Sequence, residues 1–157
     1  MTESVQRLEA GAKAPAFSVP DQNGVTTALS DLKGSKAILY FYPAAGSPGC
    51  TKEAADFQEA LPEFEKLGYR IVGISPDGVE RLKNFEDAHD LTFTLLSDTE
   101  MTMHKAFGAH GEKSLYGRIY RGALRSTIVL DEAGTVTHAM YNVKATGHTN
   151  MLLRKLA

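Results

Sequence analysis

The sequence predicts an α/β protein with a mixed central sheet, helices on both sides of it and an N-terminal β-hairpin. Three apolar runs rich in strand-forming residues, at 36–43, 69–77 and 93–98, alternate with segments of helical periodicity. A further pair of strand patterns at 126–143 is followed by an amphipathic segment at 147–157. Parallel βαβ units that end in an antiparallel strand pair and a helix are the arrangement of a thioredoxin-like fold.

The first elements are short. Residues 16–32 predict two strands joined by a turn at Asn23-Gly24, then a helical turn capped by Ser30. The run "KAILYFYP" at 36–43 is apolar throughout and ends at Pro43, which is typical of a central strand covered on both faces.

The middle of the chain predicts two helices between buried strands. Apolar residues recur every three or four positions from Cys50 to Leu67, which indicates a helix that Pro62 kinks or restarts. Residues 69–77 form the second strand, 79–89 the second helix and 93–98 the third strand. The last part predicts a short helix at 101–107, a long loop at 108–125, the hairpin at 126–143 and the closing helix.

The composition fits one compact domain over residues 1–157. The chain has 43% hydrophobic residues, and its 17 basic and 19 acidic residues give a formal charge of -2 without charge runs. This balance argues against nucleic acid or an anionic membrane as the partner. The N-terminus lacks the pattern of a signal peptide and no apolar run is long enough to span a bilayer, so a cytosolic protein is expected.

Cys50 is the single cysteine of the chain, so neither an intramolecular disulfide nor a cysteine zinc cage can form. It stands where the strand at 36–43 gives way to a helix. The backbone N–H groups and the positive end of the helix dipole there favour a thiolate, which is the nucleophilic form. Since no histidine or aspartate is locally spaced as a base, an O–O bond is a better target than an acyl group. The alternative to a reactive thiolate is a small buried core thiol with no chemical role.

The motif "PAAGSPGC" at 43–50 matches Pro-x-x-x-Thr/Ser-x-x-Cys, and the chain resembles the peroxiredoxins on this account. "SPGCTKEAADF" is similar to the bacterioferritin-comigratory-protein branch, also called peroxiredoxin Q. The blocks "GAKAPAFSVPDQNG", "IVGISPD", "FTLLSD", "YGRIYRGALRSTIVLDEAG" and "YNVKATGH" extend the similarity over almost the whole chain.

This resemblance implies a thiol-dependent peroxidase that reduces hydrogen peroxide and organic hydroperoxides and protects against oxidants. Cys50 is then the peroxidatic nucleophile, Pro43 and Ser47 shape the peroxide pocket, Pro43 shields it, and the Ser47 hydroxyl donates a hydrogen bond to the peroxide. Ser47 is also a candidate for the helix cap. Arg125 is the expected stabiliser of thiolate and substrate, and its planar fork of donors suits that role. Glu53 is expected either to hold the Arg125 guanidinium or to compensate the helix dipole.

The chain departs from the family at Ala55. Many members of the branch carry a resolving cysteine there, five residues after the first. Either this is a natural one-cysteine enzyme, or it is a Cys→Ala variant of a two-cysteine parent, and the sequence does not decide. In both cases the reductant is external, namely a low-molecular-weight thiol or a thioredoxin-like protein. In the two-cysteine case, disulfide closure would require the helix start to unwind, so mobility is expected around 46–60.

Other assignments remain open. The alternative function is a redox-sensing module that is oxidised stoichiometrically at Cys50. The segment 108–122 is either a solvated connection or, with Leu115 and Tyr116, the rim that receives bulky hydroperoxides or the reductant. The five histidines are expected at the surface or at helix ends, and no cofactor or metal is expected. A monomer is preferred and a dimer is the alternative.

Overall fold

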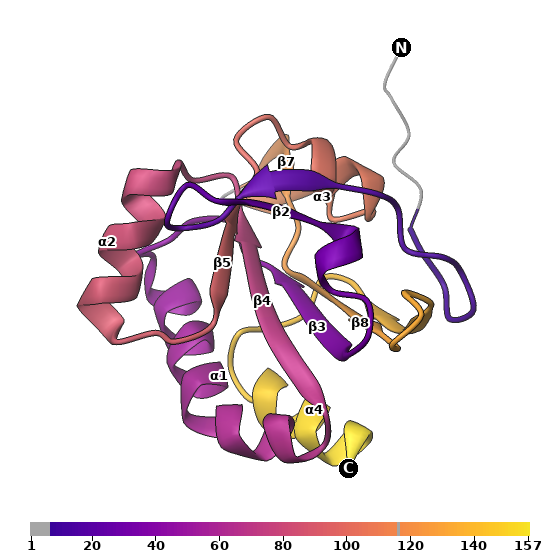
Figure 1. Cartoon of the computed structure of the whole chain (residues 1–157). Coiled ribbons are helices and arrows are strands. Elements are labelled where there is room, and N and C mark those ends of the chain that lie inside the picture. The colour runs from indigo at the N-terminus through magenta and orange to yellow at the C-terminus, as the bar shows by residue number, and fades with distance from the viewer. Residues whose placement is uncertain (1–6, 116) are drawn as a thin grey trace.

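A five-stranded mixed sheet forms the centre of the molecule, with strand order β5-β4-β3-β8-β9 (Figure 1). The computed structural model describes residues 7–115 and 117–157. The strands are β1 Ser18–Pro20, β2 Thr26–Ala28, β3 Lys36–Phe41, β4 Tyr69–Ser75, β5 Thr94–Ser97, β6 His110–Leu115, β7 Arg118–Ala123, β8 Ser126–Leu130 and β9 Val136–Met140. The helices are η1 Leu29–Asp31, α1 Pro48–Lys66, α2 Val79–His89, α3 Thr102–Ala106 and α4 His148–Leu156.

Strand β3 lies in the middle of this sheet, as its continuous apolar run predicts. It pairs in parallel with β4 and antiparallel with β8, with Leu39 opposite Val72 on one side and Ile128 on the other. Strand β5 extends the parallel half and β9 the antiparallel half. The mixed α/β sheet of a thioredoxin-like fold is therefore confirmed.

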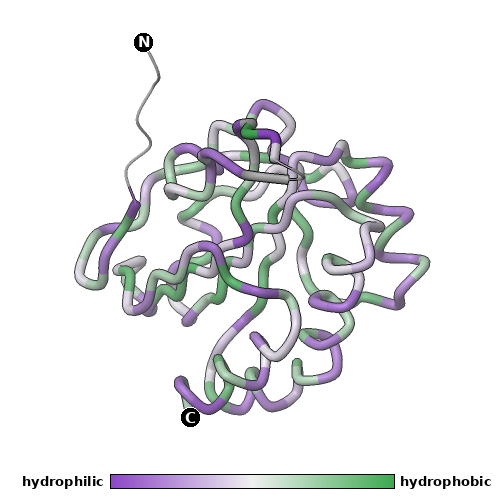
Figure 2. The backbone as a smooth tube through the Cα atoms, turned by 180° about the vertical axis from the view of Figure 1, so that it is seen from behind, coloured by the Kyte–Doolittle hydropathy of each residue, from purple (hydrophilic) through white to green (hydrophobic). Residues whose placement is uncertain are grey.

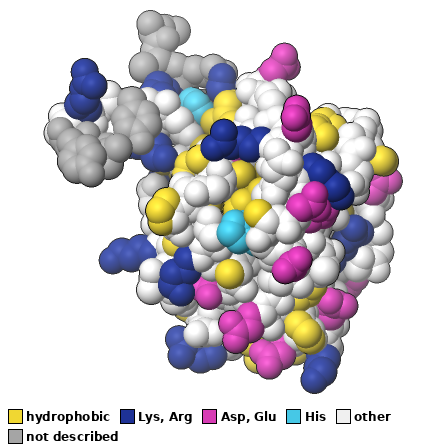
Figure 3. Space-filling model, turned by 90° about the vertical axis from the view of Figure 1, so that its left-hand side faces the viewer, with side chains coloured by type: hydrophobic (Ala, Val, Ile, Leu, Met, Phe, Trp, Pro, Cys, Tyr) yellow, Lys and Arg dark blue, Asp and Glu magenta, His cyan; other side chains and the backbone are white. Residues whose placement is uncertain are grey.

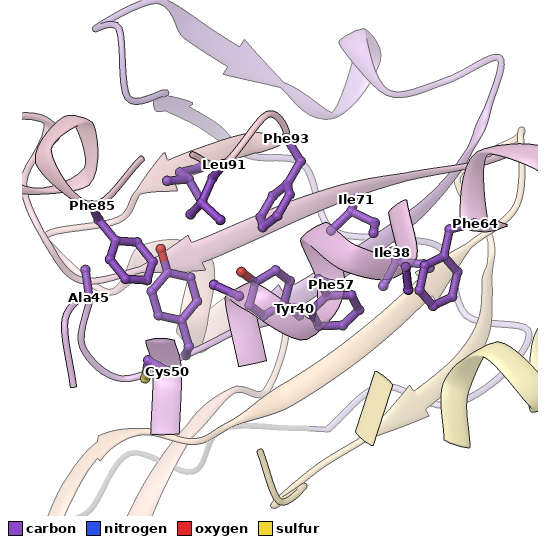
Figure 4. Close-up of a cluster of buried hydrophobic side chains, with 14 of the residues drawn as sticks. Ile38, Tyr40, Ala45, Cys50, Phe57, Phe64, Ile71, Phe85, Leu91 and Phe93 are labelled. Carbon is purple, nitrogen blue, oxygen red and sulfur yellow. The ribbon is translucent and has the colours of Figure 1, made fainter. Parts of the chain in front are cut away.

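Alternate residues of β3 enter two separate hydrophobic cores. Ile38 and Tyr40 pack with side chains of α1, α2 and α4 on one face. Leu39 and Phe41 pack on the other face, where α3 and the N-terminal segment cover the sheet. Figure 2 shows the hydrophobic stretches running through the interior, and Figure 4 shows the first core with Cys50 at one end and Phe64 at the other.

Helix α1 runs without interruption through Pro62, so the expected restart is wrong. Pro62 lies on the exposed side of the helix, where water can satisfy the backbone carbonyl that loses its partner. Phe57 and Phe64 are fully buried on the opposite side. The apolar stripe that the sequence shows from Cys50 onward therefore faces the sheet.

The N-terminal hairpin is confirmed, but the expected cap at Ser30 is wrong. Strands β1 and β2 pair antiparallel, and η1 follows directly. The residue before η1 is Ala28, and the Asp31 carboxylate accepts a hydrogen bond from its N–H at 2.8 Å. Asp31 therefore satisfies the backbone group that a capping serine was expected to satisfy.

The segment 108–125 is a third correction, because most of it is not a loop. Strands β6 and β7 form an antiparallel hairpin in which Glu112 lies opposite Arg121. Apolar residues near its tip, such as Ile119 and Tyr120, are adjacent in sequence and do not alternate with polar ones, and Ile119 is 72% exposed, so the usual hydrophobic signal of a strand is absent. The Leu115 side chain and Tyr116 lie outside the described residues.

Charged side chains of both signs are interspersed over the face shown in Figure 3. Within the described part of the chain, no helix is long and apolar enough to cross a membrane.

Gly73 on β4 provides a test of this packing. A Cβ atom there would lie 3.0 Å from the ring carbons of Tyr40, which is fully buried. We expect Gly73→Ala to lower the free energy of unfolding by about 1 to 3 kcal/mol through overpacking. Urea titration measures this. Gly78→Ala, which meets no atom within 4 Å, is the matched control. Equal stabilities of the two variants would contradict the packing around Tyr40.

Candidate active site

Cys50 lies in the first turn of α1, as predicted. Strand β3 ends at Phe41, a short turn follows, and α1 begins at Pro48 with Ser47 as its N-cap residue. The Cys50 side chain is only 1% exposed and packs at the end of the first core. The start of the helix, with its free backbone N–H groups and the positive end of its dipole, therefore lies next to this sulfur.

Arg125 reaches Cys50 from the other half of the sheet. It stands between β7 and β8, and Ser126, the next residue, pairs with Phe41 at the end of β3. Its Nη2 donates to the Cys50 sulfur at 3.4 Å. Burial alone would lower the pKa of Arg125, but the nearby Glu53 and Cys50 raise it above its ordinary value. The guanidinium is therefore a permanent positive charge beside the thiol.

Glu53 holds the guanidinium from the opposite side. Its Oε1 lies 2.5 Å from Arg125 Nη1, and the Glu53 side chain is fully buried. Burial raises the pKa of Glu53 to about 7, although the charge and hydrogen bond of Arg125 oppose this shift. The first turn of α1 contains no acidic residue, so the dipole alternative is wrong and the contact with Arg125 is observed.

Gly49 leaves the space that the guanidinium occupies. A Cβ atom at this position would lie 3.3 Å from Arg125 Nη2 and 3.8 Å from the Cβ of Ala145. The backbone carbonyl of Arg125 accepts a hydrogen bond from Val143 at 3.0 Å, which ties the following segment over the same place. A side chain at position 49 would therefore crowd the Arg125 guanidinium, which explains the glycine before Cys50 on steric grounds.

Ser47 is placed beside the helix start, but its hydroxyl does not cap the helix. The hydroxyl donates to the Ala44 carbonyl at 2.9 Å, while the Ser47 carbonyl accepts from Thr51 at 2.9 Å. The expected side-chain cap is therefore wrong. Because its proton is directed at Ala44, the Ser47 oxygen retains its acceptor capacity in this conformation.

Pro43 and Arg125 line one hollow of about 370 Å³ at the protein surface. Lys113 from β6 and Val143 from the segment before α4 also line it. The hairpin that was expected to be a loop thus provides one wall of this hollow. Cys50 is not itself part of the lining, and Arg125, which lines the hollow, contacts its sulfur.

Ala55 faces away from Cys50. It is exposed on α1, whereas Cys50 is buried, in agreement with a separation of about 140° for residues five apart on a helix. A sulfur at position 55 would point to solvent. The structure does not distinguish a natural alanine from an introduced one.

Two of the histidines expected at the surface or at helix ends are buried, and one of them, His148, does lie at a helix end. His148 begins α4, and its Nε2 lies 2.8 Å from Thr127 Oγ1 on β8. Burial and the charge of Arg125 lower the pKa of His148. His104 is fully buried, with its Nδ1 2.7 Å from Asp98. The partner of His148 lies on another element, so no local spacing reveals it, whereas Asp98 precedes His104 by only six residues. Within the described ranges, no group of three or more ligating side chains forms a metal site.

Comparisons with known proteins agree on one family. The AhpC/TSA family profile matches residues 10–139. A Mycobacterium tuberculosis protein named as a peroxiredoxin is 52% identical over 151 residues, which cover 96% of each chain. Peroxiredoxin Bcp of Escherichia coli is 39% identical over 149 residues, which cover 95% of this chain and 96% of that protein.

Solved structures give the same result. Peroxiredoxin Q of Xanthomonas campestris superposes with a TM-score of 0.86 at 36% identity and covers 94% of this chain and 96% of that one. A structure of the bacterioferritin comigratory protein of the same organism, studied for alkyl peroxide reduction, gives a TM-score of 0.87 at 36% identity, covering 94% and 97%.

The buried Glu53 predicts a pH dependence of stability. Its pKa is raised in the folded protein from 4.5 to about 7, so between these pH values the folded chain holds a proton on Glu53 that the unfolded chain has lost. The contribution of this proton to the free energy of unfolding is fully present below pH 4.5 and is lost as the pH rises through 7. We expect Glu53→Gln to gain stability relative to the parent chain by roughly 1 to 3 kcal/mol between pH 5 and pH 8.

Urea titrations at several pH values measure this difference. Glu59→Gln removes a carboxylate from an exposed position of the same helix and serves as the control. A stability difference between Glu53→Gln and the parent that stays constant from pH 5 to pH 8 would contradict the raised pKa.

Proposed function

The chain belongs to the AhpC/TSA family of peroxiredoxins, and on this premise we propose that it is a peroxidase whose nucleophile is Cys50. The observation that carries the assignment is the contact between the guanidinium of Arg125 and the sulfur of the only cysteine, at the start of a helix. Its relatives of the peroxiredoxin Q and bacterioferritin-comigratory branch place it in that branch.

The oxidative step is a displacement at oxygen. The Cys50 thiolate attacks one oxygen of the hydroperoxide, an S–O bond forms and the O–O bond breaks. Sulfur loses two electrons and becomes sulfenic acid, while the other oxygen leaves as alkoxide or hydroxide and takes up a proton. The substrates are hydrogen peroxide and organic hydroperoxides, the latter in line with the alkyl peroxide reduction studied in the Xanthomonas relative.

Arg125 and Glu53 have different electrostatic roles in this step. One nitrogen of the guanidinium faces the sulfur and the other is fixed by the carboxylate, so the fork has a set orientation. Negative charge moves from sulfur to the leaving oxygen during the displacement, and a cation fixed beside both needs little reorganisation. Pro43 shields the pocket, and the Ser47 oxygen accepts a hydrogen bond from the peroxide.

The reductive half requires an external thiol. Because the chain has no second cysteine, a thiol attacks the sulfenic acid of Cys50, releases water and leaves a mixed disulfide. A second thiol then restores the Cys50 thiol and leaves as a disulfide. A low-molecular-weight thiol and a thioredoxin-like protein are the two candidate reductants. A monomer that works in the cytosol in antioxidant defence is the proposed setting, and sedimentation and cell fractionation test those two points.

Turnover distinguishes an enzyme from a sensor. With hydrogen peroxide and thioredoxin plus its reductase, we expect continuous peroxide consumption, and a dione probe should label Cys50 when no thiol is added. Cys50→Ser is expected to show neither reaction. Consumption of a single equivalent of peroxide in the presence of every thiol donor tried would favour the sensing module. A folded parent chain that the probe never labels would remove Cys50 as the nucleophile.

Arg125 gives a second test. We expect Arg125→Ala to slow the reaction of Cys50 with hydrogen peroxide about a hundredfold, because it removes a fixed donor from the charge that develops in the transition state. Stopped-flow measurement of the second-order rate constant checks this. Arg118→Ala, at an exposed position on β7, is the control. Equal rates for the two variants would remove Arg125 from the site.

A further inference from the structure

The turn at 44–47, between β3 and α1, has a conformation that its own residues only partly determine. Gly46 has a left-handed backbone with φ of 89°, and the Ser47 hydroxyl is bonded to the Ala44 carbonyl. Ala45 is 2% exposed and lies at the same end of the core as Cys50 (Figure 4). A buried peptide of this kind needs hydrogen-bond partners from elsewhere in the chain.

Two side chains of another segment hold the Ala45 residue from both sides. Its N–H donates to Asp77 Oδ2 at 2.7 Å, and its carbonyl accepts from Arg81 Nη2 at 3.4 Å. Arg81 Nε also lies 3.3 Å from Asp77 Oδ1. Asp77, Arg81 and the Ala45 backbone are together called the Asp77 clamp below.

The clamp is anchored to the ends of two neighbouring parallel strands. The Ser75 hydroxyl, at the end of β4, donates to Asp77 Oδ2 at 2.8 Å. The Ser97 hydroxyl, at the end of β5, donates to the Asp77 carbonyl at 2.6 Å. The Asp77 side chain is 13% exposed and that of Arg81 is 66% exposed. Asp77 is therefore the principal anchor, since an exposed ion pair contributes little.

We propose that Asp77, assisted by Arg81, is a positioning residue for the peroxidase reaction. It acts through the turn at 44–47, which follows Pro43 and ends at Ser47. By fixing this turn, Asp77 keeps Pro43 and Ser47 in the positions that align a peroxide for attack by Cys50. This inference rests on the proposed function. Without the carboxylate the Ala45 N–H is left buried and unpaired, and the turn relaxes to find another partner. In-line attack on an O–O bond is sensitive to such displacements.

The test compares two reactions of the same sulfur in the intact protein. One is the second-order rate constant with hydrogen peroxide, which needs access to the sulfur and an aligned O–O bond, and the other is alkylation by iodoacetamide, which needs access alone. For Asp77→Ala we expect the ratio of peroxide rate to alkylation rate to fall by about tenfold or more. Asp77→Asn keeps an acceptor oxygen and should recover part of the loss. Arg81→Met should show a smaller fall than Asp77→Ala.

Asp87→Ala, an equivalent truncation at an exposed position of α2, is the control and should leave the ratio unchanged. If Asp77→Ala does not fold by circular dichroism, Asp77→Asn and Arg81→Met decide the matter, and unchanged ratios in both would overturn the proposal. A folded Asp77→Ala with the parental ratio would also overturn it. A parent chain that does not react with peroxide would instead overturn the proposed function, so the two failures are distinguishable.

Discussion

The buried arrangement of Glu53, Arg125 and Cys50 is the interaction on which the rest of the site depends. A carboxylate and a guanidinium are brought out of water next to a thiol, and each is costly to bury alone. The carboxylate compensates the charge of the arginine, and the arginine donates a hydrogen bond to the sulfur. Truncation of either Glu53 or Arg125 would leave the other side chain buried without its hydrogen-bond partner.

The sheet topology explains how residues so distant in sequence meet. Cys50 and Glu53 lie on α1, which follows the central strand β3, whereas Arg125 precedes β8. Because β8 pairs antiparallel with β3, it begins where β3 ends, and Arg125 is delivered to the start of α1. The parallel neighbours β4 and β5 end on the same side, where Asp77 holds the turn that leads to the helix.

Much of the fold and the centre of the site could be predicted because their signals are local. Apolar runs gave the central strands, and the motif at 43–50 marked Cys50 at a helix start. The remainder depends on contacts between distant elements. The Ser47 hydroxyl accepts no hydrogen bond from the helix N–H groups and is instead turned toward the Ala44 carbonyl. The hairpin β6–β7 lacks strand periodicity, and His148 is buried because its partner is Thr127 on another element. Pro62 was tolerated because it faces solvent.

The central claim is that the folded site, and not the thiol by itself, makes Cys50 reactive toward peroxide. The most direct measurement is the rate at which Cys50 takes up one oxygen atom from hydrogen peroxide, followed by intact mass spectrometry in buffer and in concentrated urea at the same pH. The folded chain should be oxidised at Cys50 far faster than the unfolded chain. Equal rates in the two conditions would contradict the claim, because the reactivity of the sulfur would then not depend on Arg125, on Glu53 or on the helix start.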